Sequence, residues 1–352
     1  MLEFLTKKTR FLGLDIGTTA IKAAELHFSG GRFQLSSYSI LTNYGHLERL
    51  NDAIQTSSFK ISEQSVAGMV STILKKSKID VADVVMSVSN FSSYTTVLDF
   101  PYVSDKEISQ AMPFQAKQHV PIPMSEVVLD HQVVEEQSGR LLILLIAVPK
   151  DLINRYIKIA KLCNLKIKAI ELEAISMARI LMAKDPNPSL ILDIGGRITS
   201  LVVTDKSSVR MTGTIDIAGG DLTQLLSSGL SVSPMRAEEI KKAYGLKPPP
   251  GQESITGLMT TVLDNIKLEA ERMIAAYYRK SGRTINQIYV TGGSANLIGL
   301  LEYFSTNSNL KFIKGDLFEL GLVDYTPSLA PIIKDIGPSL TVACGLAVKG
   351  LQ

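Results

Sequence analysis

The stretch FLGLDIGTTAIKAAEL, residues 11–26, has a counterpart in LILDIGGRITSLVVTD, residues 190–205. Each contains an apolar run of strand length, then Asp-Ile-Gly, then small or hydroxyl residues, and then a second apolar run. The runs that follow, RFQLSSYSIL and VRMTGTIDI, extend the repeat to a meander of three strands. The sequence therefore predicts two duplicated β-sheet domains that face each other.

The Asp-x-Gly turn has a chemistry of its own. Glycine lets the backbone bend so that its N–H groups face an anion, and the carboxylate can hold a magnesium ion through water. Asp15 and Asp193 are the two carboxylates in question. Two such hairpins would grip the phosphate tail of a nucleotide from opposite sides. A third glycine turn would leave room for the base and ribose, and it contains Gly292, Gly293 and Ser294.

Composition narrows the class of protein. The chain has 352 residues, of which 45% are hydrophobic, and its net charge is +3, so we expect no strong attraction to nucleic acid or anionic lipid. Cys163 and Cys344 lie in apolar runs and are expected to be buried, reduced thiols. The four histidines show no metal-ligand spacing. The apolar run at 141–149 is too short to span a bilayer, so we expect a soluble, cytoplasmic protein.

Changes in composition suggest the domain boundaries. We expect a first domain at 1–186 that includes an α+β insert at about 85–165. The linker DPNPS at 185–189 leads to a second domain at 187–352, with a helical subdomain at about 234–287.

The motifs LDIGTTAIK, LDIGGRITS, VTGGSANL and ACGLAV occur in an order that resembles the actin-like ATPases. The resemblance implies an α/β actin-like fold, with two RNase H-like domains around a nucleotide cleft. Two further stretches are similar to the PilM family: DKEISQAMPFQAKQHVPIPMSEVVLDHQVV, which lies in the insert, and LLIAVPKDLINRYIKIAKLCNLKIKAIELEAISMARIL. FtsA carries the same type of insert but continues into an amphipathic helix, for which GLAVKGLQ offers no counterpart. PilM is therefore the family that the chain resembles most.

The resemblance assigns roles to residues at matching positions. Those implied to contact ATP are Asp15, Gly17, Thr18, Thr19, Lys22, Asp193, Gly195, Gly196, Gly219, Gly220, Glu238, Lys241, Lys242, Gly292, Gly293 and Ser294. Asp15 and Asp193 would hold Mg²⁺ through water, and Asp193 and Glu173 would serve catalysis, Glu173 by orienting the attacking water.

Simpler interpretations of these residues remain open. Lys22 can be a surface residue, Glu173 a surface acid, and the charges of 238–242 a solvated helix face. Arg197 and Ile198 stand where hydrolysing relatives have small or hydroxyl residues, so the sequence favours nucleotide binding over fast hydrolysis.

The family implies a cytoplasmic, ATP-binding component of the type IV pilus assembly platform. It would bind the N-terminal cytoplasmic peptide of a PilN-like inner-membrane protein, contact other platform proteins, and reach the membrane only through partners, without nucleic acid. The peptide groove would lie between the insert and the first domain, with walls from Phe100, Met112, Phe114 and Val120, unless these residues form the core of the insert. Two alternative functions remain, an FtsA-like filament and a small-molecule kinase. Open questions are whether ATP is hydrolysed slowly, whether a homo-oligomer forms, and whether the machine is a pilus or a type II secretion or competence machine.

Overall fold

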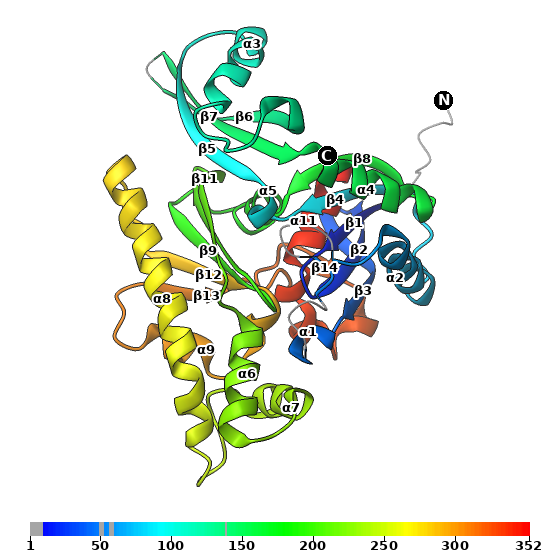
Figure 1. Cartoon of the computed structure of the whole chain (residues 1–352), viewed down its shortest axis with the longest axis vertical. Helices are drawn as coiled ribbons and strands as arrows, with labels where there is room; N and C mark the ends of the chain where they lie inside the picture. The colour runs from blue at the N-terminus through cyan, green and yellow to red at the C-terminus, as the bar shows by residue number, and fades with distance from the viewer. Residues whose placement is uncertain (1–9, 49–52, 56–59, 138) are drawn as a thin grey trace.

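The structure of the chain is a computed structural model, and it describes residues 10–48, 53–55, 60–137 and 139–352 (Figure 1). Two large sheets, each with helices packed against it, lie side by side, and a smaller α+β unit projects from one end (Figure 1). In the part of the chain that the structure describes, no helix is both long and apolar enough to cross a membrane.

The first half is built on a sheet of strand order β14-β3-β2-β1-β4-β8. The strands that come first in the sequence, β1, β2 and β3, form two antiparallel hairpins. Strand β4 then pairs parallel to β1, and β8 pairs parallel to β4. The central strands are nearly continuous apolar runs because helices cover both faces of the sheet. The strands are β1 (Arg10–Ile16), β2 (Ala20–Ser29), β3 (Arg32–Thr42), β4 (Asp83–Val88), β8 (Lys166–Leu172) and β14 (Asp324–Tyr325).

The second half repeats this topology. Its strand order, β11-β10-β9-β12-β13, matches β3-β2-β1-β4-β8 strand for strand, with the same parallel and antiparallel pairs. The duplication predicted from the two Asp-Ile-Gly stretches is thus confirmed. The strands are β9 (Ser189–Ile194), β10 (Thr199–Asp205), β11 (Ser208–Ile215), β12 (Gln287–Thr291) and β13 (Lys311–Lys314).

Helices cover both sheets. Those of the first half are α1 (Gly45–Glu48), α2 (Glu63–Lys76), α4 (Lys150–Leu162) and α5 (Glu173–Leu181). Those that follow β9 in sequence are α6 (Gly219–Leu230), α7 (Pro234–Tyr244), α8 (Ser254–Ser281), α9 (Leu300–Ser305), α10 (Ile333–Ile336) and α11 (Thr341–Leu351).

The last helix, α11, packs on the first sheet rather than on the second. Its Ala343 carbonyl lies so close to Gly13 of β1 that a Cβ there would be 1.8 Å from the oxygen. The core of the first half accordingly includes residues from Leu317 to Val348, although we expected 187–352 to form one domain. The chain returns to its first sheet because the apolar face of that sheet needs a second cover.

The insert is a separate small unit. Its sheet has the order β5-β7-β6, with β5 (Tyr94–Pro101), β6 (Val127–Gln137) and β7 (Arg140–Pro149), and α3 (Asp105–Ala116) packs on one face. The short turn η2 (Asn90–Ser92) leads into it from β4, and α4 leads back. Alternate residues of β7 face α3 and the core of the first half, so the insert is fixed to that half.

The structure decides between the two interpretations of the insert residues. Phe100, Met112 and Val120 are at most 6% exposed and belong to the core of the insert, so they do not line a groove. Phe114 is 77% exposed, so it does not belong to that core. Cys344 is buried as expected, but the expectation is wrong for Cys163, which is only half-buried at the end of α4. Both thiols are free. Among the four histidines, the side chain of His46 lies outside the part that the structure describes.

Candidate functional site

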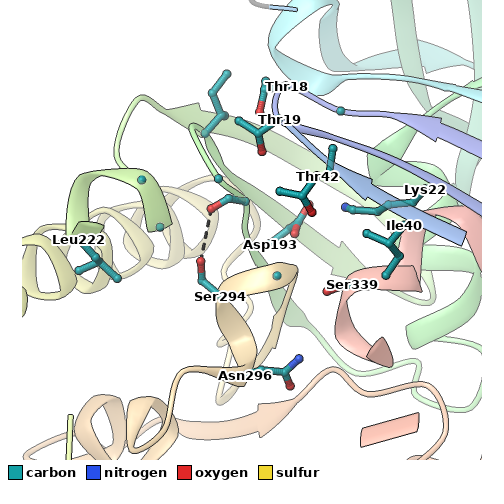
Figure 2. A pocket seen from close by; sticks show the side chains of 18 of the residues that line it. Thr18, Thr19, Lys22, Ile40, Thr42, Asp193, Leu222, Ser294, Asn296 and Ser339 are labelled. Atoms are coloured by element: carbon teal, nitrogen blue, oxygen red, sulfur yellow. Dashed lines mark hydrogen bonds between the residues drawn. The ribbon is translucent and has the colours of Figure 1, made fainter. Parts of the chain in front are cut away.

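A cavity of about 530 Å³ lies between the two halves. The first hairpin (β1–β2) and the second (β9–β10) face each other across it. Figure 2 shows side chains of both halves entering it, with Lys22 pointing toward Asp193. The predicted residues that line the cavity are Asp15, Gly17, Thr18, Thr19, Lys22, Glu173, Asp193, Gly195, Gly196, Gly219, Gly220, Glu238, Lys241, Lys242, Gly293 and Ser294.

Gly292 is the predicted residue that does not line the cavity. It lies behind Asp193 with a φ of +85°, and a Cβ there would be 2.2 Å from Oδ1 of Asp193. Glycine is needed at this position because no other side chain fits between the strand and the carboxylate. Ile198 lines the cavity, whereas Arg197 does not.

Three carboxylates surround one ammonium group in the cavity. Lys22 lies opposite Asp15 in the β1–β2 register, and its Nζ is 3.4 Å from Oδ2 of Asp15. Burial lowers the pKa of Lys22, but Asp15, Asp193 and Glu173 outweigh burial and raise that pKa. Ser87 donates to Oδ1 of Asp15 over 2.8 Å. Lys22 is therefore a cleft residue and not a surface residue.

Glu173 is buried at the first position of α5. Burial is the main cause that raises the pKa of Glu173, and Asp15 and Asp193 raise it further. Burial also raises the pKa of Asp193, against the effect of Lys22. Oε2 of Glu173 accepts a hydrogen bond from the Asn90 backbone N–H over 3.2 Å. The site thus concentrates negative charge, which favours protons or cations.

The glycine turns of the second half hold one another in place. The Gly219 amide donates to the Gly195 carbonyl over 3.0 Å, and the Gly220 amide donates to the Gly196 carbonyl over 2.7 Å. Ser294 Oγ donates to the same Gly195 carbonyl over 3.4 Å. The amides of Gly219 and Gly220 are therefore used within the protein and are not open to a ligand.

The first hairpin presents different groups to the cavity. The Gly17 amide closes the turn on the Ala20 carbonyl at 2.9 Å. The amides of Thr18 and Thr19 make no hydrogen bond to any described residue. A Cβ at Gly196 would lie 2.3 Å from Oγ1 of Thr19, so the two loops touch. Both threonines line the cavity, and backbone amides without a protein partner in such a glycine-walled loop suit an anion.

Three charged residues of α7 form a fixed cluster. Lys241 Nζ donates to Oε2 of Glu238 at 2.6 Å, and to the Gly219 carbonyl and Thr223 Oγ1 at 2.7 Å each. Its three N–H donors are therefore all occupied. Burial chiefly lowers the pKa of Lys241, whereas the pKa of Glu238 is lowered because the lysines outweigh its burial. Lys241 positions the Gly219 turn, and the solvated-face interpretation fits Lys242 alone.

Several cavity residues were not predicted, because they lie outside the repeated motifs. Tyr44 and Leu47 come from the segment after β3 and reach across to the second half. Lys242 Nζ donates to the Tyr44 hydroxyl over 2.9 Å, and Gln224 Nε2 donates to the Leu47 carbonyl. The other unpredicted residues include Phe91, Asn296, Asp335 and Ser339. One contact between side chains and one from a side chain to a backbone carbonyl therefore join the two halves beside the cavity.

The residues fit a nucleotide with a hydrated cation. Open amides and Lys22 suit phosphate oxygens, and the buried carboxylates suit Mg²⁺. In the described ranges, however, no three His, Cys, Asp or Glu side chains are close enough to hold a metal alone. An ion would need oxygens from phosphate or water.

The chain was compared with known proteins. A family model described as "Type IV pilus assembly protein PilM" matches residues 13–351. The cell division protein FtsA of Pseudomonas aeruginosa is 24% identical over 217 residues, which cover 55% of this chain and 50% of that protein. The chain thus spans about half the length of this curated relative.

Solved structures share the fold. The structure titled "PilM-PilN type IV pilus biogenesis complex" is 22% identical, covers 98% of this chain and 99% of that chain, and has a TM-score of 0.82. MreB 5 of Spiroplasma citri bound to AMPPNP is 15% identical, covers 97% and 96%, and has a TM-score of 0.53. The fold is the actin-like ATPase fold, as expected. Since the family model spans nearly every residue, the chain belongs to the family of the type IV pilus assembly protein PilM.

Proposed function

We propose that the chain binds ATP with Mg²⁺ in the cavity between its two halves. The observation that carries this proposal is the convergence of Asp15, Lys22 and Asp193 from two equivalent hairpins. The amides of Thr18 and Thr19 and the ammonium of Lys22 would hold phosphate oxygens. Asp15 and Asp193 would hold waters on the cation, which supplies charge that offsets the phosphates.

The same residues indicate slow hydrolysis at most. Glu173 is the acid placed to orient water, yet its raised pKa favours the protonated form, which is a poor base. Ile198 lines the cavity where hydrolysing relatives have small or hydroxyl residues. An apolar, branched side chain there offers no hydrogen bond to an attacking water. Binding and retention of nucleotide is thus the better-supported activity.

For its cellular role, we propose a cytoplasmic adaptor of the type IV pilus assembly platform at the inner membrane. Its partner would be the N-terminal cytoplasmic peptide of a PilN-like membrane protein. Membership of the PilM family supports this role. The β6 edge of the insert offers a docking surface, because an extended peptide can pair with an edge strand. Val128 is 42% exposed on this edge, close to where Lys150 Nζ of α4 donates to the Ser125 carbonyl over 2.6 Å.

One calorimetric experiment tests both parts. Purified protein is titrated with ATP and Mg²⁺, and separately with a synthetic N-terminal peptide of the PilN-like protein from the same organism, with and without the nucleotide. We expect saturable binding of both ligands and hydrolysis slower than nucleotide release. Absence of peptide binding in every condition would remove the adaptor role, and absence of ATP binding would remove the nucleotide site. Sedimentation with ATP tests the filament alternative.

A further inference from the structure

One end of the first half carries a concentration of positive charge. The parallel strands β1, β4 and β8 begin at this end, and Asp15 lies near the other end of β1. The helices α2, α4 and α11 end here. Gly350 of α11 packs on the Phe11 ring, and Cys163 at the end of α4 donates to the Ala67 carbonyl of α2 over 3.4 Å. We call this surface the basic end, and its residues are Arg10, Lys75, Lys76, Lys78, Lys161, Lys166 and Lys349.

The lysines of the basic end are exposed and lack counter-ions. All six form no ion pair with any residue in the described ranges, whereas Arg10 pairs with Asp80 and Glu25. Residues 75–83 and 158–168 contain seven lysines and two aspartates, a net charge of +5, although Lys158 pairs with Glu63 and Lys168 with Asp83. The whole chain has a net charge of only +3, so the rest of it is slightly acidic. The near-neutral total conceals a marked asymmetry.

Two large apolar side chains are exposed at the same end. Phe28 is 52% exposed at the tip of the β2–β3 hairpin, next to His27, which lies opposite Arg10 in the β1–β2 register. Its ring packs edge-on against Phe33 at 5.2 Å, which holds it at the tip. Leu162 at the end of α4 is 47% exposed beside Lys161. Lysines can bind a layer of negative charges, and the exposed apolar side chains among them can insert into an apolar layer beneath those charges.

We propose that the basic end binds the anionic surface of a lipid bilayer directly. The charges are spread over the ends of three helices and the starts of two strands, so they form a broad surface. A membrane presents many phosphates over such an area, and each lysine near it strengthens binding by about fivefold. A single acidic peptide would satisfy few of these lysines at once. The contact needs neither nucleotide nor the insert, so it is independent of the function proposed above.

Flotation with lipid vesicles tests this proposal. The full chain is mixed with vesicles of 70% phosphatidylcholine and 30% phosphatidylglycerol, or of phosphatidylcholine alone, at low salt. We expect binding to the anionic vesicles only, and loss of binding at high salt because screening weakens exposed charges. The double variants K75Q/K76Q and K161Q/K166Q should each bind about 25-fold more weakly. Phe28→Ser should weaken binding at every salt concentration at which the wild type still binds.

The matched control is K106Q/K117Q, which removes two exposed lysines from α3 and its end on the insert. It lowers the net charge equally but should bind as the wild type does. Equal loss in the control would show a net-charge effect and overturn the proposal. Equal binding to neutral vesicles, or no binding by the wild type, would also overturn it. One variant at the basic end changes α2 and the other changes α4 and β8, so misfolding of one leaves the other as a test.

Discussion

The backbone amide of Asn90 donates to Oε2 of Glu173 over 3.2 Å, and Oδ1 of Asn90 accepts from the Ala174 amide over 3.2 Å. Asn90 begins η2, the turn through which the chain enters the insert, and its neighbour Phe91 lines the cavity. The acid of the cavity and the root of the insert therefore form one hydrogen-bonded unit. A change in the charge of Glu173 alters the strength of a bond to the insert.

The raised pKa of Glu173 predicts a pH-dependent stability. The folded chain retains a proton on Glu173 that the unfolded chain loses above a pH of about 4.3, so stability falls as pH rises from there through the raised pKa. Glu173→Gln removes this component. We expect its thermal unfolding temperature, measured without nucleotide, to exceed that of the wild type by a margin that grows from pH 5 to pH 8.

Glu302→Gln is the control, because Glu302 is exposed and its pKa is lowered chiefly by a hydrogen bond from Lys247. The unfolding temperature of Glu302→Gln should not rise relative to that of the wild type between pH 5 and pH 8. If the unfolding temperatures of the wild type and Glu173→Gln differ by the same amount at all pH values, the raised pKa of Glu173 is contradicted.

Asp15→Asn should separate ligand binding from folding. The asparagine keeps an acceptor for Ser87 and removes the negative charge next to Lys22. We therefore expect unchanged or higher stability, because carboxylate repulsion falls. The affinity for ATP with Mg²⁺, measured by calorimetry, should fall at least tenfold, which is about 1.4 kcal/mol. Asp335→Asn, at an exposed carboxylate on the cavity rim, is the control and should change affinity little. Wild-type affinity in folded Asp15→Asn would exclude Asp15 from the site.

Tyr44→Phe should accelerate nucleotide exchange. The hydrogen bond between the Tyr44 hydroxyl and Lys242 joins the two halves at the cavity, so we expect it to restrict the entry and exit of nucleotide. Its loss should raise the association and dissociation rates severalfold, with little change in Kd. Stopped-flow fluorescence with a labelled ATP measures both rates. Tyr102→Phe, exposed on the insert, should leave both rates unchanged. Faster dissociation alone would show instead that Tyr44 contacts the nucleotide.

The repeated strand patterns made the fold predictable from sequence. Each Asp-Ile-Gly turn follows a buried apolar strand, and the repeat of that pattern fixed both the duplication and the facing hairpins. The return of α11 to the first sheet was not predictable, because its small apolar residues suit either sheet. The contact is decided by the glycine at position 13, whose close approach to Ala343 is visible only in three dimensions.

The site was predictable in its membership and less so in its chemistry. Every residue predicted from motif positions except Gly292 lines the cavity, but the motifs could not show that the amides of Gly219 and Gly220 are already paired. They could not show either that Lys241 uses all its donors within the protein. Such facts depend on contacts between loops far apart in the sequence. Tyr44 was missed because a single aromatic residue after a strand carries no local signal.

The proposed peptide site predicts a specific effect of Val128→Lys. Val128 is exposed on the β6 edge and lies opposite Val148 of β7. An extended peptide pairing with this edge would place an apolar side chain near Val128. With a lysine at position 128, binding of the peptide would remove the lysine's charge from water, which is unfavourable. We expect at least tenfold weaker binding of the PilN-like peptide in calorimetry, with unchanged affinity for ATP. Leu268→Lys, 43% exposed on α8, is the matched control and should bind the peptide normally. Wild-type peptide affinity in folded Val128→Lys would move the peptide site away from β6 and leave the nucleotide site untouched.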